Sequence, residues 1–526
     1  MEKWIKNCEA DHEKCSHHSG APLPTRVVDI GHSNDAIRLL ETNEASGSYV
    51  CLSHCWGESS TILCTRDTYD GFTNNIPWNL LPSLFRDAIE VCRRLKIRYL
   101  WVDKLCIIQH DKEDWAREGS KMAQIYEGSF LTIAALTSKN DRDPLFFKDD
   151  TNAPSQRSHT GLMEDDTVYT VYSRIPVNYH PGNQGRQAEL DEHYPLMTRA
   201  WVYQERLLAP RILYFGKELS WECRETSECE CSGMNVGLKY AHSQSLTSCS
   251  TSQLYLQWQN MVESYTSLRL SHEDDRLPAF SGLAQQFQRH LQSTYLAGLW
   301  KNNLMGDLLW SSLEGWVREE PRYCTRKPEK WRAPSWSWAS VEGPIDFFSE
   351  LEKYKTLTYK IDVITAECTP SSVDQLGAVL QGRLVVKGRS RQVLLRHTED
   401  CIGTKTRHYS SEIIDVQSYS VKNHFDVENQ SAMVDYDLIE QGLMKPNSAM
   451  SVHCLEIAGT HYMQSVSNDE SREEYSLQPA YRSWSLLLHC VGGNNFERVG
   501  LVKQFYLTEK ETPPWDSMSE DIFTII

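Results

Sequence analysis

Three short apolar segments alternate with helix-forming sequence early in the chain, and this pattern constrains the fold more than any other feature. Residues 48–54 (SYVCLSH), 99–102 (YLWV) and 130–136 (FLTIAAL) are apolar, β-branched and aromatic, as buried strands are. Between the first two, residues 82–95 carry apolar side chains at a helical period. A strand, a helix and a parallel strand in that order form a right-handed βαβ unit. The pattern therefore predicts an α/β fold with an open parallel sheet of the doubly wound type.

The rest of the chain differs in composition from this segment, which predicts four regions. Residues 137–195 are polar and indicate an insertion, whereas the chain after residue 345 alternates apolar and polar residues as strands do. Trp331, Trp336 and Trp338 stand at the entry to this β-rich part, where we expect them to staple two domains together. The predicted regions are an N-terminal arm (1–44), the α/β domain with its insertion (45–225), a loop and helical region ending in the tryptophan-rich motif (226–345) and a β-rich C-terminal domain (346–526).

Charge and apolar content argue against two classes of partner. The 526 residues include 54 Lys and Arg against 71 Asp and Glu, a formal net charge of −17, which does not suit a protein that binds a phosphate backbone. No segment approaches the roughly 20 consecutive apolar residues of a membrane span. The first residues lack the apolar core of a secretory signal. We therefore expect a cytoplasmic protein that binds neither nucleic acid nor membrane and keeps its 16 cysteines reduced.

Two groups of potential metal ligands lie far apart in the sequence. The N-terminal group follows the spacing C-x3-H-x2-C-x-H and consists of Cys8, His12, Cys15, His17 and His18. The second is a C-x5-C-x-C cluster of Cys223, Cys229 and Cys231. Neither spacing matches a standard zinc motif, although zinc bound between the two groups is conceivable. We therefore predict a flexible or docked arm and exposed loop thiols, and we assign no metal.

Several motifs resemble those of one known family and appear in its order. They include YVCLSHCWG at 49–57, YLWVDKLCIIQ at 99–109, RAWVYQER at 199–206 and APSWSWAS at 333–340. Together they resemble the heterokaryon incompatibility (HET) domain of fungal proteins. Lys104 stands where that family commonly has a small residue. The resemblance implies an intracellular protein of non-self recognition or regulated cell death.

The HET family is itself thought to be a distant relative of Toll/interleukin receptor (TIR) domains, which are flavodoxin-like folds that either self-associate or cleave NAD. Residues 49–54 look like the first TIR strand, and residues 95–103 look like a helix end and a second strand closing on Asp103. The sequence W-x-x-Q-E at 201–205 looks like the TIR motif W-C-x-x-E, with Val202 in place of the Cys. The resemblance therefore implies Glu205 as the catalytic carboxylate, with NAD as the substrate and no cofactor required.

Cleavage of the nicotinamide–ribose bond passes through an oxocarbenium-like state, which a nearby carboxylate such as Glu205 would stabilise. Gln204 and Arg199 are candidates to bind the substrate, and Trp56 or Trp201 could stack on one of its rings. The alternative is structural, because ion-pair networks also perturb carboxylates. In that case Glu205 would hold its helix to the sheet through three arginines, Arg199, Arg206 and Arg211.

Asp103, His54 and Cys55 are further catalytic candidates, because each lies at the end of a predicted strand. Ligands usually bind at the carboxyl ends of the strands in an open α/β sheet, although an Asp there often caps a helix or turn. His54 and Cys55 are adjacent, and neighbouring side chains on a strand point to opposite faces, so they do not easily pair. A Cys55 nucleophile with His110 as its base and Asp103 orienting the base is a further alternative.

These residues support three hypotheses of function. The leading one is a HET-domain protein of non-self recognition and regulated cell death that hydrolyses NAD at its N-glycosidic bond. The second is a non-catalytic signalling module that associates with itself or with a protein partner. The third is a HET fold recruited as a metabolic enzyme, which would act on a small organic substrate with Cys55 or His54.

Overall fold

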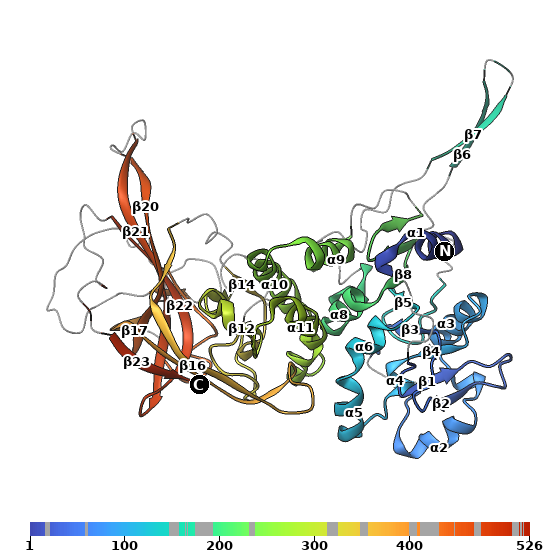
Figure 1. Ribbon diagram of the computed structural model, residues 1–526, viewed down its shortest axis with the longest axis horizontal. Helices are drawn as coiled ribbons and strands as arrows, with labels where there is room; N and C mark the ends of the chain where they lie inside the picture. Colours follow the sequence, from blue (N-terminus) through green and yellow to red (C-terminus); the bar gives the residue numbers. More distant parts are fainter. Residues whose placement is uncertain are drawn as a thin grey trace. The chain divides into compact units, whose positions relative to one another are not determined.

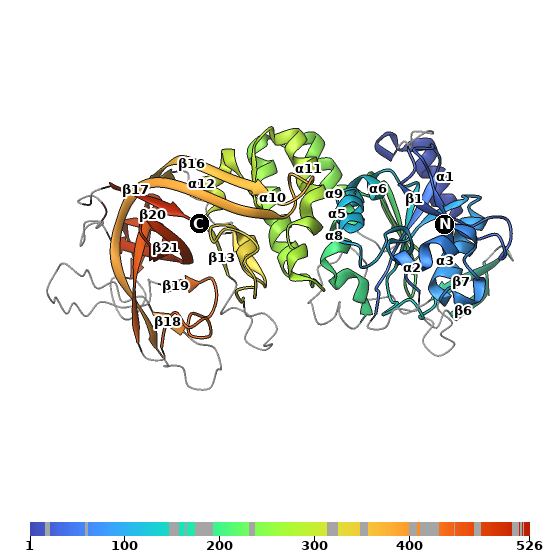
Figure 2. The same ribbon diagram turned by 90° about the horizontal axis from the view of Figure 1, so that it is seen from below.

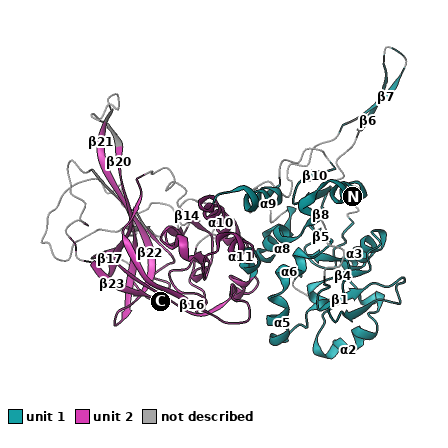
Figure 3. Cartoon of the chain, in the orientation of Figure 1, with its two compact units in different colours: residues 1–250, 279–283 teal, residues 251–278, 284–526 magenta. Residues whose placement is uncertain are grey.

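A computed structural model of the chain shows its architecture (Figure 1). It divides into two compact units, residues 1–250 with 279–283 and residues 251–278 with 284–526 (Figure 3). No helix among the described residues is long and apolar enough to cross a membrane. The structure describes residues 1–15, 22–57, 62–146, 157–163, 165, 167–173, 193–230, 237–312, 325–347, 356–398, 408–410, 431–445, 448–467, 475–507, 515, 518 and 520–526.

The first unit is built on a mixed sheet, which has the strand order β10-β9-β8-β5-β3-β4-β1-β2 among the described residues. Its central strands β4, β3, β5 and β8 are parallel, as predicted, whereas the strands at both edges run antiparallel to their neighbours. The fold is therefore α/β, with a mixed sheet in place of the predicted parallel one. The strands are β1 (Arg26–Asp29), β2 (Arg38–Glu41), β3 (Tyr49–Ser53), β4 (Tyr99–Trp101), β5 (Leu131–Ala135), β8 (Arg211–Phe215), β9 (Leu219–Cys223) and β10 (Ser227–Cys229).

Helices connect the parallel strands of this sheet. α3 (Ser83–Arg94) lies between β3 and β4 in the chain, where the apolar period predicted a helix, and it buries Leu84, Phe85, Ala88, Ile89 and Cys92. Arg93 and Arg94 occupy its last turn, where positive charge complements the helix dipole. The other helices are α1 (Glu2–Asp11), α2 (Arg66–Asn74), α4 (Asp103–Cys106), α5 (Lys112–Gly119), α6 (Met122–Glu127), α8 (Ala200–Leu208) and α9 (Leu238–Ser248).

Two segments expected to be irregular, the N-terminal arm and the loop after residue 225, contain regular structure, and the insertion has a strand where residues 167–172 alternate. Part of the predicted N-terminal arm belongs to the sheet, because β2 pairs with β1 and β1 pairs with β4. Asp29 in β1 accepts hydrogen bonds of 2.7 and 2.8 Å from the guanidinium of Arg98. The insertion contains a hairpin of β6 (Arg157–Leu162) and β7 (Val168–Ser173). The predicted loop after residue 225 contains β10 and α9.

The second unit combines helices with a β-rich part, as the sequence predicted. Its helices among the described residues are α10 (Thr251–Thr266), α11 (Pro278–Leu291) and α12 (Leu304–Asp307), and residues 279–283 of α11 belong to the first unit. β11 (Tyr295–Leu296) pairs with β12 (Leu299–Trp300), and β13 (Trp310–Ser312) pairs with β14 (Ile345–Phe347).

The largest sheet of the second unit has the order β15-β20-β21-β22-β23-β17-β16 among the described residues, with β18 beside β17 and β19 beside β22. Its long strands β16 and β17 run side by side in an antiparallel pair (Figure 2). The strands are β15 (Thr358–Tyr359), β16 (Ile361–Pro370), β17 (Val379–Thr398), β18 (His408–Ser410), β19 (Ser431–Val434), β20 (Ala449–Ser467), β21 (Tyr475–Gly492), β22 (Asn495–Leu507) and β23 (Glu520–Ile525).

Buried tryptophans fill the core of the second unit. Trp336 and Trp338 are fully buried, whereas Trp331, the third member of the predicted staple, is 53% exposed. The indole N–H groups of Trp258 and Trp338 both donate to the carbonyl of Gly298 at 3.0 Å. Two residues of the tryptophan-rich motif are therefore core residues of this unit, and the staple between two domains stays a prediction.

Candidate functional site

The carboxyl ends of β3 and β4 bring several predicted site residues together with helix α8. Ser53 is the last residue of β3, Asp103 follows β4 at the start of α4, and Glu205 lies in α8. The Ser53 hydroxyl donates to Glu205 Oε2 over 2.5 Å. Trp56 Nε1 donates to Asp103 Oδ2 over 2.7 Å. We call Ser53, His54, Trp56, Asp103 and Glu205 the strand-end cluster.

Glu205 is a buried carboxyl group with a perturbed pKa. Burial raises its pKa to about 7, and the negative charge of Asp103 contributes in the same direction. Hydrogen bonds from Ser53 and Tyr126, together with the positive charge of Arg199, oppose this shift. Such a group changes its protonation state near neutral pH, as general acids, general bases and charge-stabilising carboxylates do.

Two of the three arginines in the predicted ion-pair network have other partners. Arg206 forms a buried ion pair with Glu222, with donor–acceptor distances of 2.5 and 2.9 Å. Arg211 donates to the sulfur of Cys8 and to the backbone carbonyls of Cys15 and Phe130. Arg199, at the start of α8, is the member of this group whose charge acts on Glu205.

Asp103 and Trp56 are held in place from several sides. Asp103 Oδ1 accepts from the backbone N–H of Lys104 over 2.7 Å, which is the turn contact expected of an Asp at this position. Lys104 is fully buried and forms an ion pair of 2.7 Å with Asp141. Its ammonium also donates to the Trp56 carbonyl and lies 5.2 Å from the centroid of the Trp56 ring. Lys104, the residue that differs from the family motif, therefore helps to hold Trp56 in place.

His54 is an uncharged imidazole inside the protein. Its side chain is completely buried, and its ring packs edge-on against Phe85 at 5.2 Å. Burial lowers its pKa to about 4. Its Nδ1 is 3.9 Å from Asp103 Oδ1, beyond hydrogen-bond range, and neither ring nitrogen has a hydrogen-bond partner within the described residues.

Cys55 is buried in a core cluster of mainly apolar side chains. Burial raises the pKa of its thiol, while the charge of Arg199 and a hydrogen bond with it act in the opposite direction. A buried thiol of this kind is a poor nucleophile. His110, the proposed base for Cys55, is an exposed residue in the turn after α4. Cys55 belongs to a buried core cluster whose other members are Ala134, Leu136, Tyr194, Leu196, Val202, Ile212 and Tyr214.

The predicted substrate-binding residues of α8 differ in their surroundings. Trp201 is half-buried and packs edge-on against Trp115, with ring centroids 6.5 Å apart. Gln204 is buried, and its Oε1 accepts from the backbone N–H of Gly282 over 3.2 Å. Its carbonyl group is therefore engaged in helix packing.

Sequence reasoning did not identify Ser53, Tyr126 or the Lys104–Asp141 pair as parts of this site. Ser53 is separated from Glu205 by 152 positions, so no local spacing connects the two. The feature that could have identified Ser53 is its position as a polar residue at the end of an apolar strand. The sequence indicated the burial of Lys104 only weakly, through its position just after a strand and next to Asp103.

A second cluster of reactive side chains lies elsewhere in the first unit. Cys8, His12, Cys15 and Cys223 place one ligand atom each within 4.8 Å of one another. Cys229 is not part of this cluster, because its thiol donates to Glu218 Oε2 over 3.1 Å. Three other potential ligands named from the sequence, His17, His18 and Cys231, lie outside the described residues.

The fold and the strand-end cluster define an α/β domain with a buried carboxyl group at the carboxyl ends of its central parallel strands. Residues 49–205 match the family model described as heterokaryon incompatibility protein (HET). This match bears out the resemblance to the HET family for these residues. The match begins at the first residue of β3 and ends at Glu205, and it covers less than half of the chain. No curated protein and no solved structure matches the chain.

Proposed function

We propose that the HET domain acts in non-self recognition and regulated cell death by hydrolysing the N-glycosidic bond of NAD or a related nucleotide, with Glu205 as the essential carboxylate. The observation that carries this proposal is the environment of Glu205. Its carboxyl group is buried beside Ser53 and Tyr126, and its pKa is about 7. Burial makes an ionised carboxylate costly, so such a group is expected where its charge is used.

The strand order supports a ligand site at this position. In chain order, β3, β4, β5 and β8 are the first to fourth parallel strands, and they lie in the order second, first, third, fourth. This is the order of doubly wound flavodoxin-like sheets, to which the proposed TIR-like relationship would assign the domain. Ligands of such sheets bind at the carboxyl ends of the strands, where the chain reverses its direction of winding. Ser53 ends the first of these strands.

The surrounding groups suit a reaction that develops positive charge. Cleavage of the nicotinamide–ribose bond leaves an oxocarbenium-like ribose, and ionised Glu205 would stabilise that cation. The hydroxyl groups of Ser53 and Tyr126 would orient the carboxylate, because both hydrogen-bond to it. Asp103 would add a second negative charge, and the indole of Trp56 would offer a ring for stacking.

Nicotinamide release by the purified full-length chain tests this proposal. Glu205→Gln keeps the shape of the side chain and removes its charge, so we expect at least a roughly 100-fold loss of rate. Glu90→Gln, on the exposed face of α3, is the matched control and should leave the rate unchanged. In the wild type the rate should rise with pH through about 7, because the ionised carboxylate is the active form.

Other outcomes would favour the alternative functions. Equal rates for wild type and Glu205→Gln, or no turnover by either protein, would contradict the proposal. Absence of turnover together with concentration-dependent assembly would favour a self-associating signalling module. Turnover of a small organic substrate that thiol alkylation abolishes, and that Glu205→Gln does not affect, would favour a metabolic enzyme using Cys55 or His54.

A further inference from the structure

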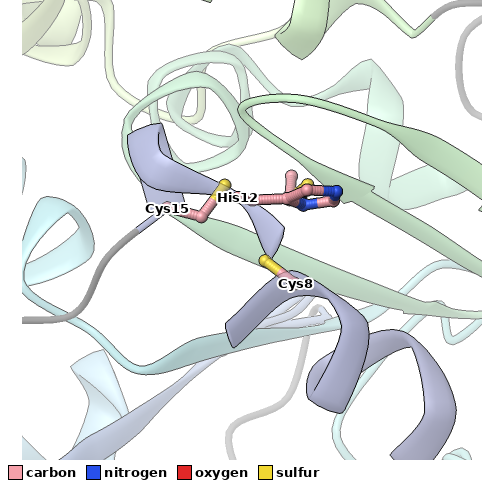
Figure 4. A group of neighbouring side chains, drawn as sticks. Cys8, His12 and Cys15 are labelled. Carbon is pink, nitrogen blue, oxygen red and sulfur yellow. The ribbon is translucent and has the colours of Figure 1, made fainter. Parts of the chain in front are cut away.

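We propose that Cys8, His12, Cys15 and Cys223 bind one structural zinc ion in the first unit. The N-terminal segment supplies three of the ligands, from α1, the residue that follows it and a short 3-10 turn (Glu13–Cys15). Cys223, the last residue of β9, supplies the fourth. Figure 4 shows the side chains of Cys8, His12 and Cys15 turned toward one another. The site lies apart from the strand-end cluster and does not depend on the proposed function.

The distances within the cluster fit a tetrahedral metal site. All four ligand atoms lie within 4.8 Å of one another, and Cys223 Sγ is 3.3 Å from His12 Nδ1. Zinc bonds of about 2.3 Å to sulfur and about 2.0 Å to nitrogen place the ligand atoms of a tetrahedron roughly 3.5–3.8 Å apart. Small side-chain movements would therefore complete the coordination. All three cysteines are free thiols in the structure.

The buried positive charge of Arg211 beside the cluster also favours an anionic group there. Arg211 is completely buried, and among the described residues its hydrogen-bond partners are the Cys8 sulfur, at 3.2 Å from Nε, and the carbonyls of Cys15 and Phe130. A buried guanidinium without a carboxylate partner is costly. Zinc with three thiolates and one imidazole has a net charge of −1, which would neutralise Arg211.

Backbone and side-chain donors point at the ligand sulfurs. The Thr226 N–H donates to Cys223 Sγ over 3.3 Å, and Arg211 donates to Cys8 Sγ. Such second-shell donors orient metal ligands and balance the charge of bound thiolates. Three thiolates and one imidazole complete a closed coordination shell of the kind found in structural zinc sites, which leaves no position for a substrate.

The metal would explain how α1 is attached to the sheet of the first unit. α1 buries only Ile5 and Cys8, so apolar packing alone gives it little hold on the sheet. The zinc ion would fasten α1 to the end of β9, a strand more than 200 positions away in sequence. The last ligand is remote from the other three, and for this reason the spacing resembles no standard zinc motif.

Metal analysis of the full-length chain, produced with zinc in the medium, tests the proposal. We expect one zinc per chain in the wild type and loss of that zinc in Cys223→Ala. Cys92→Ala is the matched control, because Cys92 is an equally buried thiol on α3 that lies outside the cluster. It should retain one zinc.

A second variant separates loss of the metal from loss of the fold. His12→Cys offers a fourth thiolate and should retain zinc, while X-ray absorption changes from three sulfur ligands and one nitrogen to four sulfurs. Wild-type chain without zinc, zinc that persists in Cys223→Ala, or an absorption spectrum unchanged by His12→Cys would each overturn the proposal. A disulfide among Cys8, Cys15 and Cys223 in metal-free protein would overturn it as well.

Discussion

At the scale of single residues, Glu205 combines a buried position with neighbours that favour its charge. Burial nevertheless outweighs them and raises its pKa from 4.5 to about 7. A carboxyl group with a raised pKa holds its proton more tightly in the folded protein than in the unfolded chain. Its contribution to stability is therefore fully present below pH 4.5 and is lost as the pH rises toward 7.

Glu205→Gln should remove this pH dependence, because the amide does not titrate. We expect the variant to be more stable than wild type above pH 7 by about 3 kcal/mol, since one unit of pKa shift corresponds to about 1.4 kcal/mol. Below pH 4.5 the two proteins should differ little. The free energy of unfolding in urea, measured at about pH 4 and about pH 8, provides the test.

The difference between variant and wild type is the informative quantity, because His54 acts in the opposite direction. Its pKa is lowered to about 4, so its contribution to stability rises with pH between about 4 and 6.5. In the wild type the two effects partly cancel. A difference between the two proteins that is the same at both pH values would show that Glu205 titrates as an exposed carboxyl group does.

At the scale of elements, local pattern predicted the strands and helices that bury one continuous apolar surface. α3 and β3–β5 are examples, since each has a run or period of apolar side chains that is visible within a few residues. β1 and β2 were missed because each has only four residues and includes charged side chains. The pairing of β1 with β4 and of β2 with β1, rather than their own sequence, makes them strands.

The turn between β11 and β12 requires a glycine at position 298. Gly298 has a φ of +102°, and a Cβ added there would lie 2.5 Å from Nε1 of Trp338. We therefore expect Gly298→Ala to lower the free energy of unfolding of the second unit by about 2–3 kcal/mol, through backbone strain and a clash with a packed indole. Chemical denaturation followed by tryptophan fluorescence measures this change.

Gly442→Ala is the control that separates backbone strain from the clash with the indole. Gly442 also has a positive φ, +70°, but nothing lies within 4 Å of the added Cβ. Its substitution should cost only the backbone term, about 1 kcal/mol. If both substitutions cost the same, the contact between Gly298 and Trp338 is not a tight one.

At the scale of the whole molecule, the chain has two units, each with its own core. Domains with separate cores commonly unfold as separate cooperative units. We expect two transitions in chemical denaturation, and Gly298→Ala should move only the one that belongs to the second unit. Hydrogen exchange, read separately for α3 and for β21, assigns each transition to a unit. A single transition that shifts as a whole in this variant would contradict independent unfolding.

The sequence identified most residues of the strand-end cluster. Glu205, Asp103, His54 and Trp56 were predicted from motif resemblance and strand ends, and the structure places them close together. The carbonyl of Gln204 accepts from the backbone of α11, and its role in binding substrate stays a prediction. The sequence does not show which polar side chains of α8 face the cluster and which pack against another helix. α8 is buried on almost all sides, so it has no polar face that would separate the two groups.

The sequence by itself determined the α/β alternation, the likeness of residues 49–205 to the HET family and the β-rich character of the second half, since each of these depends on short stretches of the chain. Only the tertiary structure decided that Ser53 meets Glu205 and that Cys223 joins Cys8, His12 and Cys15. Helical and strand periods act over a few residues, whereas these contacts join residues 152 and more positions apart. Strand order and helix packing create such proximities, and no short-range pattern carries that information.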